Sequence, residues 1–387
     1  MKKIFVASLM LSSVLGVAQV NKRPITGAVF QQIVPDARAG GMADMGVATS
    51  ADAYSQYWNP SKYLFHKSYS GVAVSYTPWL NKISSDTFLL NLTGFTYIGQ
   101  EERSTIGASI YYFNMGKVEN NMIGPDGGII SQGSFKPNEF AIDLSYGLLL
   151  SDRLSTSVTG RYIRSKIYDN TQAAYTDKKA ASTFAVDIAG FYQSAVWNGK
   201  SMDTKLRAGL MIKNIGPKLK YSDASDDDGT YLPTNFGVGV GYDMIFNEDN
   251  KLTLTTEYNK LLVPVAEQYD SNGDGKVNDE LYNGEYDGYQ MPDDGVLQGM
   301  FSSISESAST VSVGAEYAFK DALFVRAGYK YGDEDKGDQS VVTAGAGMKF
   351  SDFQFDASYL IPTGDQDSPL ANTLRFSLAW NFGGPVE

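Results

Sequence analysis

The 387-residue sequence contains no cysteine and only one histidine. Without cysteine the chain has no disulfide framework, no thiolate metal site and no thiol nucleophile. The one histidine, His66, would have to anchor any histidine-dependent triad, and nothing in the sequence places a serine or a pair of acids beside it. We therefore interpret His66 as a structural residue, and the sequence predicts a protein that is not an enzyme.

Positive charge and long apolar runs are also scarce. The 32 Lys and Arg residues stand against 44 Asp and Glu residues, so no basic cluster is available to neutralise the phosphates of a nucleic acid. After residue 18 no apolar run approaches the roughly twenty residues of a transmembrane helix. Tyrosine, phenylalanine and glycine are abundant instead, at 25, 20 and 39 residues. Such enrichment is typical of β-barrels that face lipid.

The N-terminus has the three-part layout of a secretory signal peptide. Lys2 and Lys3 form a positive start, residues 4–17 are largely apolar, and small residues then predict cleavage before Gln19. The apolar run is too short for a membrane-spanning helix, and a buried N-terminal core helix is the weaker alternative. We therefore expect residues 1–18 to be a signal peptide and the mature chain to be exported.

Apolar and polar residues alternate along many segments, as they do on a β-strand with one apolar face. In residues 353–361 every odd position is apolar, and residues 374–382 repeat the pattern. Most such segments reach about ten residues, the length that a tilted strand needs to cross a bilayer, whereas soluble strands usually have about five or six. We expect fourteen strands, at residues 70–79, 86–97, 103–115, 138–149, 154–168, 182–197, 203–214, 234–246, 251–262, 309–319, 322–332, 339–350, 352–361 and 372–382.

The connections between these segments alternate between short and long. A soluble β-sandwich can show the same alternation of side chains, but it has no reason to keep this rhythm of turns, whereas outer-membrane barrels have short periplasmic turns and long extracellular loops. The sequence thus predicts an all-β protein: a fourteen-stranded antiparallel outer-membrane barrel over residues 70–387, with both termini periplasmic. The longest extracellular loop is expected at residues 263–308.

Residues 19–69 precede the first expected strand and are rich in small residues. Such a segment suits close packing inside a lumen, so we expect it to form a hatch that plugs the barrel. A periplasmic extension without contacts is the alternative. Inside the barrel, the inward-facing Glu257, Glu316, Arg326 and Lys330 are expected to neutralise one another across the lumen.

The expected hatch carries a resemblance to a known family. Its characteristic residues are Asp36, Arg38, Gly40, Gly41, Asp52, Trp58, Asn59 and Pro60. This pattern resembles the hatch of the fatty-acid-transporter (FadL-like) superfamily, and within it the PorV (LptO) branch of the bacterial type IX secretion system. The resemblance covers the whole chain, up to Trp380-Asn381-Phe382 at the end of the last expected strand. One departure is that residues 383–387 follow Phe382, which weakens the terminal-aromatic assembly signal.

The resemblance implies a function that the strand pattern alone does not. PorV-like proteins are non-enzymatic shuttles, which bind the C-terminal signal domain of secreted cargo at the large translocon barrel. They pass the cargo to a cell-surface attachment complex that contains the sortase-like PorU, with PorQ and PorZ. The alternative, from the wider superfamily, is an outer-membrane transporter of a hydrophobic small molecule. The barrel fold fits both, because function depends on the sites that a fold carries.

The longest loop contains many aromatic, leucine and methionine residues, a composition that is typical of protein-docking surfaces. A loop that packs these side chains against the barrel mouth is the alternative. The candidate partner-binding residues are Tyr269, Tyr282, Tyr286, Tyr289, Met291, Leu297, Met300 and Phe301.

The same loop contains a candidate calcium site at residues 270–281. Oxygen ligands at positions 1, 3, 5, 7 and 9, with glycine at position 6, reproduce the start of an EF-hand-type loop. These ligands are Asp270, Asn272, Asp274, the carbonyl of Lys276, and Asn278. The bidentate acid of position 12 is missing, since Leu281 stands there, and Asp279, Glu280 or Asp287 would have to replace it. An acidic turn without metal is the alternative.

Overall fold

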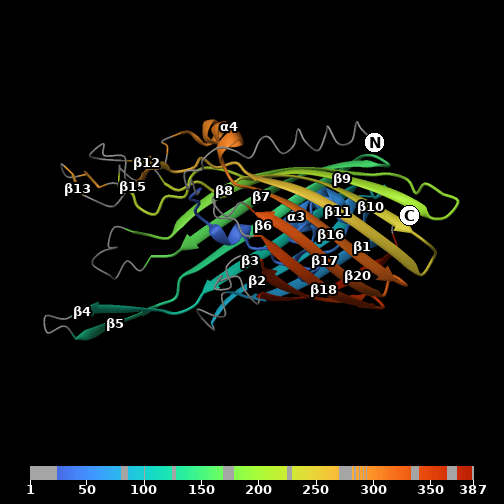
Figure 1. Cartoon of the computed structure of the whole chain (residues 1–387), viewed down its shortest axis with the longest axis horizontal. Coiled ribbons are helices and arrows are strands. Elements are labelled where there is room, and N and C mark those ends of the chain that lie inside the picture. The colour runs from blue at the N-terminus through green and yellow to red at the C-terminus, as the bar shows by residue number, and fades with distance from the viewer. Residues whose placement is uncertain are drawn as a thin grey trace, which may run out of the picture.

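A computed structural model of the chain describes residues 24–79, 86–99, 101–123, 128–168, 178–224, 229–269, 281–282, 285–286, 288–290, 292, 294–332, 340–363 and 373–385. Fourteen antiparallel strands close into one barrel. Figure 1 shows that the strands are tilted relative to the long axis of the barrel. The strands are β1 (Ser68–Pro78), β2 (Thr87–Ile98), β3 (Ser104–Met115), β6 (Asn138–Ser151), β7 (Leu154–Lys166), β8 (Ala181–Gln193), β9 (Asp203–Ile215), β10 (Asn235–Ile245), β11 (Asn250–Leu261), β16 (Ser309–Phe319), β17 (Leu323–Gly332), β18 (Val341–Phe350), β19 (Phe353–Pro362) and β20 (Thr373–Pro385).

The fold class and the number of barrel strands predicted from the sequence are confirmed. The barrel closes where β1 pairs with β20, for example at Val72 and Trp380. Two strand ends differ clearly from the prediction. β8 ends at Gln193, because the chain then leaves the ladder and Trp197 pairs with Thr204 only as an isolated bridge. β20 continues past Phe382 to Pro385, so these residues extend the last strand.

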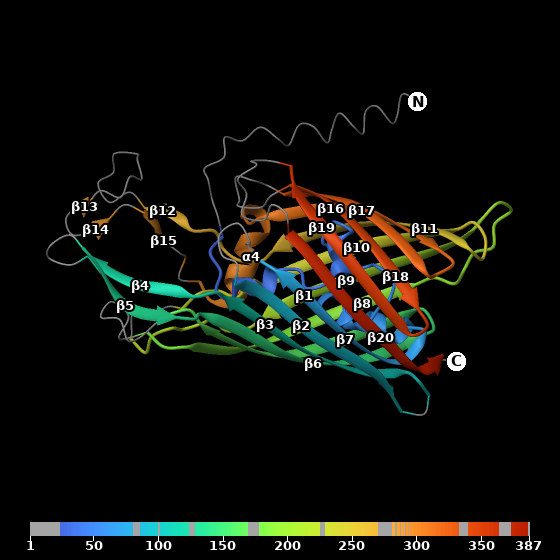
Figure 2. The ribbon, with the colours of Figure 1, turned by 90° about the horizontal axis from the view of Figure 1, so that it is seen from below.

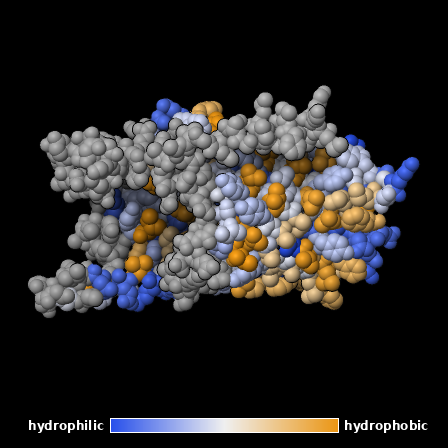
Figure 3. Space-filling model, viewed as in Figure 1, coloured by the Kyte–Doolittle hydropathy of each residue, from blue (hydrophilic) through white to orange (hydrophobic). Residues whose placement is uncertain are grey.

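Side chains on the two faces of the barrel have opposite chemistry. On β20 the outward residues Phe376, Leu378 and Trp380 are 39–44% exposed, whereas the inward Arg375 and Ser377 are buried. Figure 3 shows apolar residues spread over the outer surface of the strands. A soluble protein buries its apolar face, whereas a barrel in a bilayer presents it to lipid and keeps polar residues in its lumen. No helix in the described part of the chain is long and apolar enough to cross a membrane.

Additional elements project from the end of the barrel with the long connections, opposite the C-terminus (Figures 1 and 2). β4 (Val118–Ile123) pairs with β5 (Ile129–Phe135). Within the longest connection β12 (Glu267–Tyr269) pairs with β15 (Gly288–Gln290), and β13 (Leu281–Tyr282) pairs with β14 (Glu285–Tyr286). The helix α4 (Val296–Glu306) follows and leads directly into β16.

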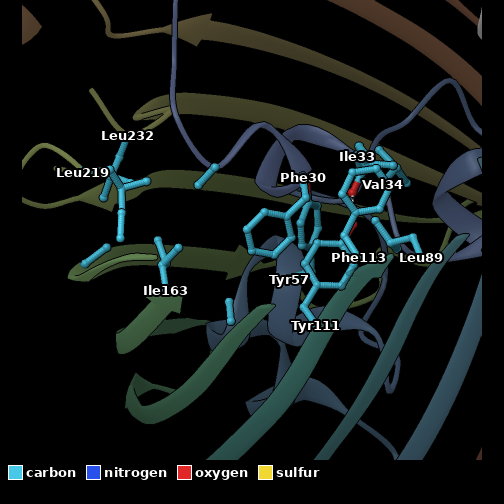
Figure 4. Packing of buried hydrophobic residues seen from close by; sticks show 14 of the residues in the cluster. Phe30, Ile33, Val34, Tyr57, Leu89, Tyr111, Phe113, Ile163, Leu219 and Leu232 are labelled. Carbon is cyan, nitrogen blue, oxygen red and sulfur yellow. Dashed lines mark hydrogen bonds between the residues drawn. The ribbon is translucent and has the colours of Figure 1, made fainter. Parts of the chain in front are cut away.

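Inside the barrel lies the hatch, which we define as residues 24–67. Its short helical elements are η2 (Val29–Gln32), α2 (Ala37–Gly40), α3 (Ser55–Trp58) and η3 (Pro60–Phe65). Figure 4 shows Phe30 and Tyr57 of the hatch beside Tyr111 of β3, with ring centroids 5.5 and 5.9 Å from that tyrosine. Phe30 is fully buried. The hatch therefore has an apolar core in common with the barrel wall.

The direction of the hatch corrects one prediction. Pro24 forms a bridge with Val265, at the long-loop end of the barrel. Lys67, by contrast, lies 3.5 Å from Asp321 in the short turn between β16 and β17. The chain thus crosses the lumen from the long-loop end to the short-turn end before β1 begins. The C-terminal strand ends on the short-turn side as expected, but the N-terminal end of the described chain lies on the opposite side. Alternation of residues could not reveal this, because it carries no information on how a segment without strands threads the barrel.

Candidate functional site: the plugged lumen and its mouth

Asp36 joins the helices α2 and α3 of the hatch. It caps the N-terminus of α2, where its carboxylate accepts a hydrogen bond from the Ala39 amide at 2.8 Å. The other carboxylate oxygen accepts from Trp58 Nε1 at 2.7 Å, which ties α2 to α3. Burial raises the pKa of Asp36 to about 6, although both hydrogen bonds favour the charged form. These two residues of the predicted motif therefore form one polar joint inside the hatch.

Asn59 and Pro60 start the last helical turn of the hatch. The side-chain oxygen Oδ1 of Asn59 accepts a hydrogen bond from the Ser61 amide, and Pro60 occupies the first helical position, where its missing N–H costs nothing. The Asn59 amide donates to the carbonyls of Val47 and of Gly190 in β8, both at 3.1 Å. One side chain thus connects two parts of the hatch with the wall.

Arg38 anchors α2 to the barrel wall through a buried network of charges. Its guanidinium bonds to Asp52 of the hatch at 2.6 Å and to Glu316 of β16 at 3.1 Å. Glu316 also pairs with Arg326 of β17 at 2.6 Å, and Arg326 pairs with Asp356 of β19 at the same distance. Buried charges are stable only when they are paired, so the hatch and three strands depend on one another here.

Two other inward charges bind the hatch and not each other. Lys330 was expected to pair with wall residues, but its ammonium lies 2.9 Å from Asp44 of the hatch. Asp44 also accepts from Arg375 of β20 at 3.0 Å. Glu257 of β11 accepts hydrogen bonds from the backbone amides of Gly46 and Val47. The expectation of mutual neutralisation across the lumen is correct only for Glu316 and Arg326.

The sequence interpretation missed Lys62 as part of this arrangement. Lys62 is fully buried, and its ammonium donates to the Gly46 carbonyl at 2.7 Å and to the Thr49 hydroxyl at 3.0 Å. A lysine inside an expected plug is the only signal that the sequence offers for this contact. Glu257 accepts hydrogen bonds from the backbone amides of the same turn. Lys62 and Glu257 together therefore hold residues 46–49 in place.

The wall approaches the hatch most closely at inward glycines. A Cβ atom added to Gly209 of β9 would lie 2.1 Å from the Val47 carbonyl oxygen. One added to Gly41, a residue of the predicted motif, would lie 2.9 Å from the Cα of Gly345 in β18. Gly40, beside it, lies against Arg375 and Ser358. No residue with a side chain fits at such distances, so these glycines let two backbones meet.

His66 ends the hatch in a structural role. Its Nδ1 accepts a hydrogen bond from the Ser68 amide at 3.0 Å, and its ring meets Phe95 edge-on with centroids 4.7 Å apart. Burial lowers the pKa of His66 to about 4, so the ring is neutral at pH 7. These contacts position the start of β1.

Two cavities flank the hatch. The mouth cavity, of about 360 Å³, lies at the long-loop end and is lined by Lys213, Asn235 and Asn259 among others. The second cavity, of about 420 Å³, lies at the short-turn end and is lined by charged residues that include Lys205 and Asp321. Neither is a continuous apolar passage through the lumen.

At the rim, α4 presents an apolar row to the outside. Leu297, Phe301 and Ile304 are 65%, 74% and 59% exposed. The opposite side of the helix is buried, since Ser303 is 1% exposed and a Cβ added at Gly299 would touch Pro264. Ile304 was missed in the sequence, although its spacing of three residues from Phe301 and seven from Leu297 is that of one helical face.

The remaining predicted loop residues divide into three groups. Met300 of α4 is partly buried. Four tyrosines lie in the short paired strands of the loop: Tyr269, Tyr282, Tyr286 and Tyr289. Met291 and the candidate calcium ligands Asp270, Asn272, Asp274, Lys276 and Asn278 lie outside the described residues. Within the described residues no group of three or more acids, histidines or cysteines is placed to hold a metal.

Comparisons with known proteins agree with this architecture. The family described as "Type IX secretion system protein PorV" matches residues 17–268. The toluene transporter TbuX of Ralstonia pickettii has a similar structure, with a TM-score of 0.51, 11% identity, and coverage of 90% of this chain and 98% of that one. The toluene transporter TodX of Pseudomonas putida has a TM-score of 0.52, 10% identity, and coverage of 88% and 95%. At these identities the likeness concerns the fold. No curated protein sequence matches the chain.

Proposed function

Because the chain belongs to the PorV family of type IX secretion system proteins and is an outer-membrane β-barrel, we propose that it binds the C-terminal signal domain of secreted proteins at the cell surface. In this proposal it performs no chemistry. It takes cargo from the large translocon barrel of the system and carries it to the attachment complex with the sortase-like PorU, and with PorQ and PorZ.

The observation that carries the proposal is the apolar row on α4. Leu297, Phe301 and Ile304 are each more than half exposed at the rim of the barrel. Large apolar side chains gathered on an exposed surface are typical of protein interfaces, and phenylalanine is among the residues enriched there. The long-loop end is the extracellular end of such barrels, so this surface faces the side on which secreted proteins emerge.

A transporter of a hydrophobic small molecule is the second candidate, and the fold shared with toluene transporters favours it. Such a transporter needs an apolar path through its lumen. Here the lumen holds buried ion pairs of the hatch, such as Asp44 with Lys330 and Arg38 with Asp52. Passage would require these pairs to separate, and both cavities beside the hatch have charged residues in their walls. This candidate is therefore the weaker one.

Binding of a purified cargo domain tests the proposal. The mature barrel in mild detergent is titrated with the C-terminal domain of a secreted protein from the same organism. We expect saturable binding that Phe301→Ala weakens about ten-fold or more, since truncation of a central aromatic residue at an interface commonly costs about 2 kcal/mol.

Phe350→Ala is the matched control. Phe350 is 79% exposed, but it lies at the short-turn end of β18, away from the proposed surface. Both variants should run as folded barrels on gels before heating. Equal affinities of Phe301→Ala and the unmodified protein would remove α4 from the interface, and a lack of saturable binding by the unmodified protein would refute the proposal.

A further inference from the structure

The mouth cavity contains a lysine that stands over two aromatic rings. Lys213, near the end of β9, is 8% exposed, and its ammonium stands 4.0 Å from the centroid of the Tyr57 ring and 5.8 Å from that of Trp58. Among the described residues this ammonium makes no hydrogen bond and no ion pair. The two rings stabilise the cation, and its N–H groups are available to a ligand in the mouth cavity, which Lys213 lines.

Nearby acids do not supply the missing acceptor, because other groups already bind them. Asp143 and Asp187 pair with Arg161 at 2.7 and 2.9 Å. Asp44, which also lines the cavity, is shared by Lys330 and Arg375. Of the described residues that line the cavity, Lys213 and Lys330 are positive and Asp44 alone is negative. Burial of a cation without a counter-charge is costly, so this arrangement favours an anion in the space that the ammonium faces.

The polar groups around Lys213 suit an anion that also carries hydroxyl or amide groups. Asn235 lies directly across from Lys213 on the neighbouring strand β10, and Asn259 of β11 lines the same cavity. Cross-strand neighbours have Cβ atoms about 5 Å apart, so the Asn235 amide can reach a group bound to the ammonium. A volume of about 360 Å³ is at the small end of the range for pockets that bind small molecules.

We propose that the mouth cavity binds an organic anion whose carboxylate or phosphate group pairs with the Lys213 ammonium, with the side-chain amides of Asn235 and Asn259 beside it. The anion is either a free small molecule, such as a sugar acid, or the terminal carboxylate of a polypeptide. This chemistry is opposite to that of a hydrocarbon pocket. The site does not depend on the proposed function, because it is defined by the cavity and not by α4.

Calorimetric titration of the mature full-length barrel in non-ionic detergent tests the site. The probes are glucuronate, glucose as its neutral counterpart, inorganic phosphate, and a short neutral peptide with a free or an amidated C-terminus. We expect saturable binding of at least one anionic probe and binding of its neutral counterpart that is at least about ten-fold weaker, because hydrogen bonds to charged groups are the stronger ones.

Lys213→Met removes the charge but keeps the apolar stem over Tyr57, and it should weaken anion binding about ten-fold or more. Lys213→Arg should retain binding. Lys205→Met is the matched control, since Lys205 lies on the same strand but lines the other cavity. Phe301→Ala should also leave anion binding unchanged, which separates this site from the proposed cargo surface.

The probes also distinguish the two sources of the anion. Binding of glucuronate or phosphate identifies a free small anion, whereas binding of the free peptide alone, abolished by amidation, identifies a chain terminus. Either result supports the site if Lys213→Met removes it. The proposal is overturned if no anionic probe binds saturably, or if Lys213→Met binds the probes as well as the unmodified protein does.

Discussion

Replacement of Gly209 by alanine tests whether the inward glycines allow the hatch to pack against the barrel wall. The new Cβ would lie 2.1 Å from the Val47 carbonyl oxygen, whereas real Cβ contacts are essentially never below 3.0 Å. The hatch must therefore move by roughly 1 Å at this turn, where Glu257 binds the amides of Gly46 and Val47. Overpacking of a tight interior typically costs about 1–3 kcal/mol. We expect Gly209→Ala to lower the free energy of unfolding by that amount and to loosen the hatch.

Two assays follow the effect of this change. Urea unfolding of the barrel in detergent measures the loss of stability, and ion conductance in planar bilayers reports a displaced hatch. Gly160→Ala is the control, because a Cβ at Gly160 meets nothing within 4 Å. If the two alanine variants have the same stability and the same low conductance, the close fit of hatch and wall described above is incorrect.

Three further predictions concern the hatch charges and the long loop. Arg38→Met leaves Asp52 without its ion-pair partner and Glu316 with Arg326 alone, and it should cost about 3–5 kcal/mol of unfolding free energy in urea, less for Arg38→Lys. Burial raises the pKa of Asp36 from 3.8 to about 6. At pH values between these two, the Asp36 carboxyl is protonated in the folded protein and charged in the unfolded chain. Between about pH 4 and 6 the unmodified protein should therefore lose stability relative to Asp36→Asn as the pH rises. Calcium should protect the loop at 263–308 from proteolysis in the unmodified protein but not in Asp274→Ala.

Each of these predictions has a result that contradicts it. An Arg38→Met barrel with unchanged urea midpoint would show that the network contributes no stability. A stability difference between Asp36→Asn and the unmodified protein that stays constant with pH would mean that Asp36 does not titrate in this window. Equal proteolysis with calcium and with a chelator would refute the calcium loop.

The strands could be predicted from the sequence because lipid and lumen impose opposite polarity on alternate residues. This rule holds, for instance, for Phe376 and Ser377 of β20, and it fails where the wall packs on the hatch, as at the inward Tyr111 of β3. It also assigns Glu316 and Arg326 to the lumen, where they are direct neighbours on β16 and β17 and form an ion pair. A pair of this kind follows from strand register alone.

The hatch contacts could not be predicted in the same way. Lys330 pairs with Asp44, almost three hundred positions earlier in the chain, and that choice depends on the path of a segment without periodicity. The direction in which the hatch crosses the lumen also depends on that path, so it could not be predicted either. Lys213, which makes no ion pair with the described residues, could not be singled out in the sequence either, because nothing there shows that Arg161 binds the acids Asp143 and Asp187. The helical spacing of Leu297, Phe301 and Ile304, in contrast, was available in the sequence.

Native mass spectrometry of the protein released gently from its own outer membrane tests the central claim most directly. Cargo binding predicts complexes of the barrel with secreted proteins that share one C-terminal domain, and with a very large second barrel. Release of the barrel alone, with one hydrophobic small molecule bound per chain, would contradict the proposed function and support transport through the lumen.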